Sequence, residues 1–161
     1  MHHILLLTLG LLLGTSSWLQ AQGEAAAAQE FGLSLLQAYY DHQCSYIFDH
    51  LDQHITTIQG GQKMAIQPAM KALFCEDMPI RKDITNSYSQ YQDQYRPKVY
   101  DHKEFKKQFP VWAKHFQLKA GDFFFDGANP RAAGHTRLFT SENQARFVLR
   151  YQEGDWVIIG I

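Results

Sequence analysis

The sequence has little excess charge of either sign and no long basic stretch. Its 161 residues include 15 Lys and Arg against 16 Asp and Glu, which gives a net charge of −1. This balance disfavours a nucleic-acid-binding protein, because such proteins need a basic surface for the phosphates. With 45% hydrophobic and 19% charged residues, the composition also excludes a disordered or collagen-like chain. We expect one compact domain with its own core.

Motifs of several enzyme classes are absent as well. The sequence contains no G-x-S-x-G, no H-E-x-x-H and no Gly-rich phosphate loop after an expected strand. It also contains no internal repeat and no low-complexity linker that would mark a domain boundary. We therefore expect no cofactor.

The N-terminus has the pattern of a secretory signal peptide. Residues Ile4 to Leu13 form an apolar run, small residues follow, and Ala21 fits cleavage before Gln22. A retained membrane anchor is the alternative, but a spanning helix needs about 20 apolar residues. The predicted organisation is a signal peptide over residues 1–21 and a single exported domain over 22–161, periplasmic or extracellular, with no integral membrane segment after cleavage.

Only two cysteines, Cys44 and Cys75, are present. In an oxidising compartment an even number of cysteines favours pairing, so we predict a Cys44–Cys75 disulfide. Their wide separation argues against a redox motif of the C-x-x-C kind, although two buried free thiols are the alternative.

Apolar residues at helical spacing predict helices in the first two thirds of the chain. They predict a long helix over residues 24–42, a short helix from Ser45 that passes into a strand before Gly60-Gly61, a third helix ending near Asp77, and an amphipathic helix over 84–95. Asp101 and Glu104 resemble a capping box at the start of another helix, which Pro110 must kink or divide.

After Gly121 the period of the pattern changes to that of strands. Four strands are predicted: Phe123 to Phe125, Thr136 to Thr140, Ala145 to Tyr151 and Trp156 to Ile161. The third has one apolar face and one mainly cationic face, as in an antiparallel sheet with a wetter side. The predicted fold class is α+β, with a long N-terminal helix and further helices packed on a curved antiparallel sheet formed mainly by the C-terminal strands.

This layout, with the closing segment from Glu153 to Ile161, resembles the NTF2-like superfamily, whose curved sheet wraps a long helix to make a cone. The resemblance implies a pocket at the open end of the cone and frequent dimerisation through the sheet. It does not imply one function, since related cones serve as enzymes, binding modules and structural domains. No active-site motif can be carried over to this chain.

Several residues are candidates for chemistry. His50 and His54 stand four apart, so on a helix they would form half of a metal site, although two partly exposed histidines are the simpler interpretation. A desolvated carboxylate or imidazole in the cone would serve acid–base catalysis. The candidates near the aromatic strand are Asp122, Asp126, His115 and His135.

Two further groups are candidates for binding. Tyr88, Tyr91 and Tyr95 form a stripe that would present rings to a small ligand or glycan, while packing in a core or interface explains the same spacing. Arg146 and Arg150 share a strand face and would bind an anionic group, or they form a solvated face or an interface between sheets.

The leading hypothesis is an exported NTF2-like domain that binds a small apolar or anionic ligand, or a protein partner, without catalytic turnover. The resemblance adds a homodimer formed through the sheet. Two alternatives remain open: an acid–base enzyme of the isomerase, dehydratase or hydrolase type acting in the cone pocket, and a structural subunit of an envelope assembly.

Overall fold

The computed structural model describes residues 22–41, 43–77, 96–128 and 144–161. Four predictions lie outside these residues. They are the signal peptide over 1–21, the helix over 84–95 with Tyr88, Tyr91 and Tyr95, the strand from Thr136 to Thr140, and the candidate His135.

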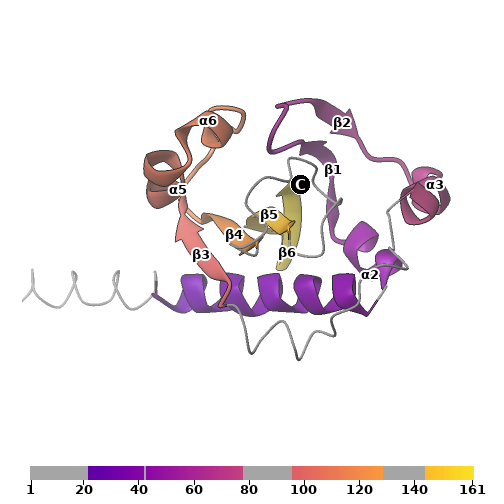
Figure 1. The fold of residues 1–161 in the computed structure, drawn as a ribbon, viewed down its shortest axis with the longest axis horizontal. Helices are drawn as coiled ribbons and strands as arrows, with labels where there is room; N and C mark the ends of the chain where they lie inside the picture. Colours follow the sequence, from indigo (N-terminus) through magenta and orange to yellow (C-terminus); the bar gives the residue numbers. More distant parts are fainter. Residues whose placement is uncertain (1–21, 42, 78–95, 129–143) are drawn as a thin grey trace, which may run out of the picture.

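The N-terminal helix covers residues 22–40 and lies along one side of the molecule (Figure 1). It buries one face, in agreement with the sequence pattern, and the buried side chains include Leu35, Leu36 and Tyr39. The helix lies very close to the sheet at Gly32, where an added Cβ would overlap the Phe125 ring. Glycine at this position therefore sets the distance between helix and sheet.

The next segment changes from helix to strand, as predicted. Helix α2 (Cys44–Asp49) leads through His50 into β1 (Leu51–Thr56), and β2 (Lys63–Ala65) pairs antiparallel with β1. Gly61, in the connection between the strands, has a φ of 65°, a conformation that favours glycine. Helix α3 (Met70–Asp77) follows, in agreement with the predicted third helix, and reaches the last described residue of this range.

Strand β3 (Lys98–Asp101) was not predicted from the sequence. Asp101 then caps α5 (His102–Gln108): its carboxylate accepts from the backbone N–H of Lys103 and Glu104, and the Glu104 side chain accepts from the backbone N–H of Asp101. The capping box is thus confirmed. Pro110 starts a separate short helix, α6 (Pro110–Ala113), so the predicted division is confirmed too.

The C-terminal strands form the centre of a curved six-stranded sheet. They are β4 (Asp122–Ala128), β5 (Gln144–Gln152) and β6 (Asp155–Gly160), and the strand order is β2-β1-β6-β5-β4-β3. Glu153 and Gly154 connect β5 to β6 with φ values of 55° and 98°, as a tight hairpin turn requires. The α+β class is confirmed, but the sheet is mixed because β1 and β6 run parallel.

The sheet packs on both faces. One face carries Phe125, Phe147 and Leu149 and packs on the N-terminal helix, while the other carries Phe124 and Val148 and packs under α5 and α6, on the opposite side in Figure 1. The expectation of a wet cationic face on β5 was therefore wrong in part. Val148 is fully buried, and the Arg146 and Arg150 side chains are each only 20% exposed.

Candidate functional site

One cavity formed by described residues has a volume of about 890 Å³. It lies between the beginning of the N-terminal helix and the end of the sheet where β4 starts. Its lining residues come from the start of the N-terminal helix, from the start of β4 with the segment before it, and from the β5–β6 hairpin. They are Gly23, Glu24, Ala27, Lys119, Ala120, Gly121, Asp122, Phe123, Arg150, Tyr151 and Trp156. The chain thus brings together residues from both ends of the described sequence.

Three aromatic rings form the apolar wall of this cavity. The ring centroid of Trp156 lies 5.9 Å from that of Phe123 and 5.4 Å from that of Tyr151, in edge-on arrangements. Trp156 also stacks on Phe31 of the N-terminal helix at 6.2 Å. Since Phe123 is buried and Tyr151 is 55% exposed, the wall runs from the core to the surface. Such a wall suits a flat apolar group.

An ion pair forms the polar part of the same wall. Arg150 donates from Nε and Nη2 to the two carboxylate oxygens of Asp122, both at 2.7 Å, and the backbone N–H of Lys119 donates to Asp122 Oδ2 at 2.9 Å. Asp122 is fully buried. The hydrogen bond to Asp122 raises the pKa of Arg150 above its usual value, against the effect of desolvation. Arg150 is therefore a permanent cation with a fixed orientation.

The second cavity is a cleft of about 370 Å³ on the other side of Arg150. Its lining residues come from β1, β2, β5, β6 and the segment after α6: Asp52, His54, Ile55, Thr56, Lys63, His115, Phe116, Gln117, Arg150 and Ile159. Three candidates that the sequence could only consider separately, His54, His115 and Arg150, thus line one cleft.

The remaining carboxylate candidate, Asp126, lines neither of these two cavities. Its carboxylate accepts from Arg146 Nε at 2.9 Å, and the Arg146 guanidinium lies 5.0 Å from the ring centroid of Trp112. Burial, followed by the negative charges of Asp126 and Glu104, raises the pKa of Tyr100 on neighbouring β3. Asp126 therefore belongs to an ion pair packed against an aromatic side chain.

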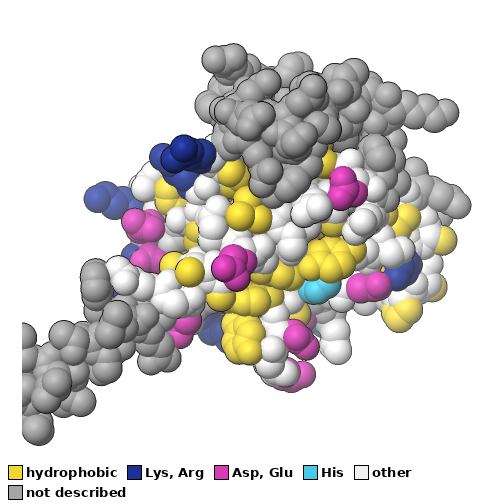
Figure 2. Space-filling model, turned by 90° about the horizontal axis from the view of Figure 1, so that it is seen from below, with side chains coloured by type: hydrophobic (Ala, Val, Ile, Leu, Met, Phe, Trp, Pro, Cys, Tyr) yellow, Lys and Arg dark blue, Asp and Glu magenta, His cyan; other side chains and the backbone are white. Residues whose placement is uncertain are grey.

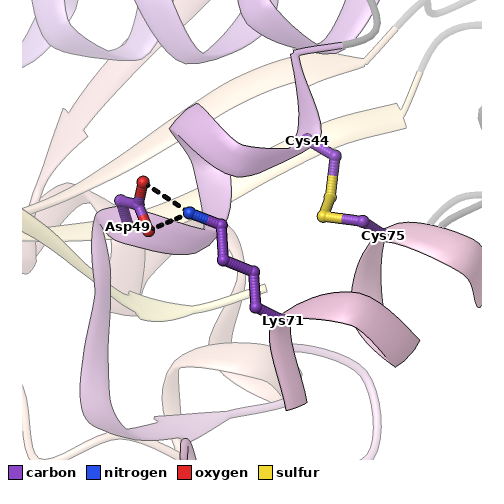
Figure 3. Close-up of a disulfide and its surroundings, with 4 residues drawn as sticks. All are labelled: Cys44, Asp49, Lys71 and Cys75. Atoms are coloured by element: carbon purple, nitrogen blue, oxygen red, sulfur yellow. Dashed lines mark hydrogen bonds and ion pairs between the residues drawn. A yellow bond between two sulfur atoms is a disulfide. The ribbon is translucent and has the colours of Figure 1, made fainter. Parts of the chain in front are cut away.

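The disulfide connects α2 to α3 (Figure 3). Cys44 and Cys75 are bonded, with their Cα atoms 5.5 Å apart, which confirms the predicted pair. In the same place Lys71 of α3 reaches both carboxylate oxygens of Asp49 at 2.7 and 2.8 Å. This exposed ion pair supplements the covalent link.

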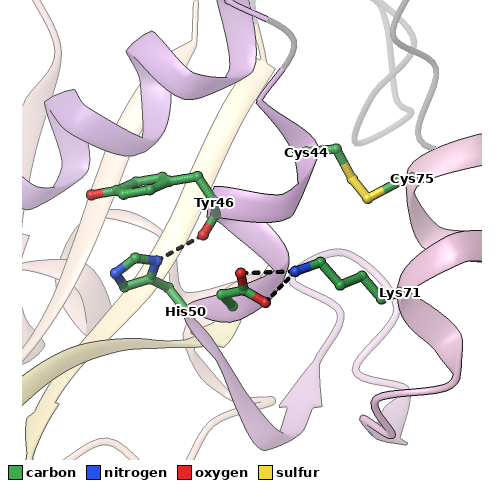
Figure 4. A network of polar contacts seen from close by, with 6 residues as sticks. Cys44, Tyr46, His50, Lys71 and Cys75 are labelled. Atoms are coloured by element: carbon green, nitrogen blue, oxygen red, sulfur yellow. Dashed lines mark hydrogen bonds and ion pairs between the residues drawn. A yellow bond between two sulfur atoms is a disulfide. The ribbon is translucent and has the colours of Figure 1, made fainter.

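His50 and His54 do not share a helical face, because β1 begins at Leu51. His50 lies under Tyr46, with Nδ1 2.7 Å from the Tyr46 carbonyl oxygen and the two ring centroids 4.5 Å apart (Figure 4). The metal hypothesis assumed that both histidines lie on one helix, and that assumption is wrong. Among the residues that the structure describes, no group of three or more His, Cys, Asp or Glu side chains is arranged to hold a metal ion.

The aromatic wall was not recognised from the sequence as a site. A usable pattern was present: two residues, Glu153 and Gly154, connect the strands, so Tyr151 and Trp156 must lie opposite each other, as the register confirms. No sequence pattern indicated that residues 23–27 of the N-terminal helix would lie close to Tyr151 and Trp156.

Comparison of the chain with protein-family models, curated proteins and solved structures found no match. Within the described ranges, no helix has the length and apolar character needed to cross a membrane. The functional argument therefore rests on the geometry of the two cavities.

Proposed function

We propose that the chain is an exported binding module for a small, largely apolar ligand with one polar group, held in the 890 Å³ cavity. The observation that carries this proposal is the cavity itself, with Phe123, Tyr151 and Trp156 on one side and the Arg150–Asp122 pair beside them. Its volume falls within the range of small-molecule sites, and its mixture of aromatic rings with a few fixed polar groups is typical of them.

Binding is favoured over acid–base turnover in this cavity. The buried carboxylate in its wall, Asp122, already accepts hydrogen bonds from Arg150 and from the backbone of Lys119. A general base needs a lone pair within reach of the substrate proton, and these donors already engage both carboxylate oxygens. The pair therefore suits orientation of a polar group on the ligand.

The proposed location and family follow from separate features. The Cys44–Cys75 disulfide is consistent with an oxidising compartment, and the apolar run before Ala21 supports export with cleavage ahead of Gln22. The long helix packed on a curved sheet supports membership of the NTF2-like superfamily. A homodimer through the sheet stays a prediction of that resemblance.

The test is a titration of the exported chain, residues 22–161, with anilinonaphthalene sulfonate, a fluorescent probe with an aromatic body and one anionic group. Ala27→Phe places a ring in the cavity and is expected to weaken probe binding about tenfold. Ala26→Phe is the matched control, because Ala26 is exposed on the same helix and does not line the cavity. Equal affinities for both variants and the unmodified chain would contradict the proposal.

A further inference from the structure

The cleft behind Arg150 has a wall that the fold holds in place at three points. After α6, the Phe116 ring packs on Gly160 of β6, at a distance that leaves no room for a Cβ there. The His115 ring packs in the same way on Gly61 of the β1–β2 connection. Arg150 Nη2 also lies 3.4 Å from the carbonyl oxygen of Gln117, which accepts its hydrogen bond. His115 is thus fixed over the edge of the sheet.

The opposite wall is formed by β1, from which Asp52, His54, Ile55 and Thr56 line the cleft. Ile55 is buried in the core beneath the N-terminal helix, so its neighbours His54 and Thr56 project from the other face. Lys63 of β2 stands opposite Thr56 in the register of the hairpin and therefore shares that face. The cleft lining that results contains both imidazoles and a lysine.

The charges around the cleft are nearly balanced when the histidines are neutral. Arg150 is paired with Asp122, and Lys63 and Asp52, which have opposite charges, both line the cleft. The Asp52 carboxylate accepts hydrogen bonds from the backbone of Gln53 and from the side chain of Gln152. The ionisable groups that line the cleft are Asp52, His54, Lys63, His115 and Arg150. Protonation of the two imidazoles would add two positive charges and raise the number of ring N–H donors from two to four.

We propose that this cleft is a second binding site, which takes a small oxyanion between His54, His115 and Lys63 and binds it more tightly as the histidines become protonated. The site is separate from the aromatic cavity, and only Arg150 lines both. Two imidazolium groups and an ammonium group are suitable donors for such a ligand, because charge-assisted hydrogen bonds are the stronger ones.

The test uses sulfate, whose charge stays constant over the range in which histidine titrates. Calorimetric titration at equal ionic strength is expected to show about tenfold tighter binding at pH 5.5 than at pH 8. The double variant His54→Gln with His115→Gln is expected to lose this difference. Lys63→Met is expected to weaken binding about threefold at both pH values, because its charge does not change between them.

His50→Gln is the matched control, since His50 lies against Tyr46 and does not line the cleft. It should bind sulfate like the unmodified chain at both pH values. Ala27→Phe should also leave sulfate binding unchanged, which separates this site from the aromatic cavity. The proposal is overturned if sulfate does not bind saturably at pH about 5.5, or if the double variant keeps the pH difference.

Discussion

At the scale of single residues, Asp122 is the charged side chain most dependent on its partner. Its carboxylate is fully buried and bound by Arg150 through two hydrogen bonds, whereas the Asp49–Lys71 pair lies at the surface. Breaking a buried pair leaves an uncompensated charge, while an exposed pair is screened by water. Loss of the buried Asp122–Arg150 pair should therefore destabilise the fold far more than loss of the exposed Asp49–Lys71 pair.

Asp122→Ala is expected to lower the free energy of unfolding by about 3 kcal/mol, because Arg150 would remain partly buried without its partner. Asp49→Ala is the control and should cost less than about 1 kcal/mol, since that carboxylate is 58% exposed. Urea denaturation of both variants measures the difference. If both variants lose a similar amount of unfolding free energy, the claim that the buried Arg150–Asp122 pair stabilises the fold is wrong.

The disulfide gives a second prediction at this scale. Cys44 and Cys75 are 31 residues apart, and closing a loop of that length restricts the unfolded chain by about 3–4 kcal/mol. The double variant Cys44→Ser with Cys75→Ser is expected to lose roughly that much stability. A urea midpoint unchanged by this substitution would contradict the prediction, and a reducing agent should affect only the unmodified chain.

At the scale of elements, the close contact between helix and sheet at Gly32 requires glycine, although a helix interior normally prefers alanine. Alanine in place of an interior glycine normally stabilises a helix by up to about 1 kcal/mol. Gly32→Ala is expected to do the reverse, with a net loss of about 2 kcal/mol, because the new Cβ would overlap the Phe125 ring and push the helix from β4.

Gly23→Ala is the control on the same helix, since an added Cβ there has no neighbour within 4 Å. It should leave thermal stability unchanged or slightly raised. If Gly32→Ala proves as stable as Gly23→Ala, the close approach of helix and β4 described above is wrong.

The elements also show what the sequence could specify. The Asp101 and Glu104 capping box and Pro110 determine local hydrogen bonds, so the start of α5 and its separation from α6 were predictable. Strand β3 was missed because it is four residues long and becomes a strand through its pairing with β4. The helical spacing of His50 and His54 misled because α2 ends at Asp49, so that His50 follows the helix and His54 lies in β1.

At the scale of the whole molecule, the sites depend on contacts between distant parts of the chain. The aromatic cavity joins residues 23–27 to Trp156, and the cleft joins β1 to the segment after α6. Alternation of residues predicts which way a side chain points, but not which distant segment faces it. The arginine and aspartate candidates were therefore visible in the sequence, whereas their pairing was not.

The side of the N-terminal helix is one face on which apolar side chains are visible. Figure 2, which looks onto the side of the N-terminal helix, shows hydrophobic side chains gathered in a band with acidic side chains around it. Trp156 stacks on Phe31 of that helix, so the helix and the cavity wall are continuous.

The most direct test of the aromatic cavity is a proton–nitrogen correlation spectrum of residues 22–161, titrated with anilinonaphthalene sulfonate. Without residues 1–21 the chain keeps two tryptophans, Trp112 and Trp156. Trp156 lines the cavity, whereas Trp112 stacks on Phe109 near Arg146. We predict that the indole N–H signal of Trp156 shifts saturably and that of Trp112 stays in place. A titration that shifts only Trp112, or neither signal, would contradict the account.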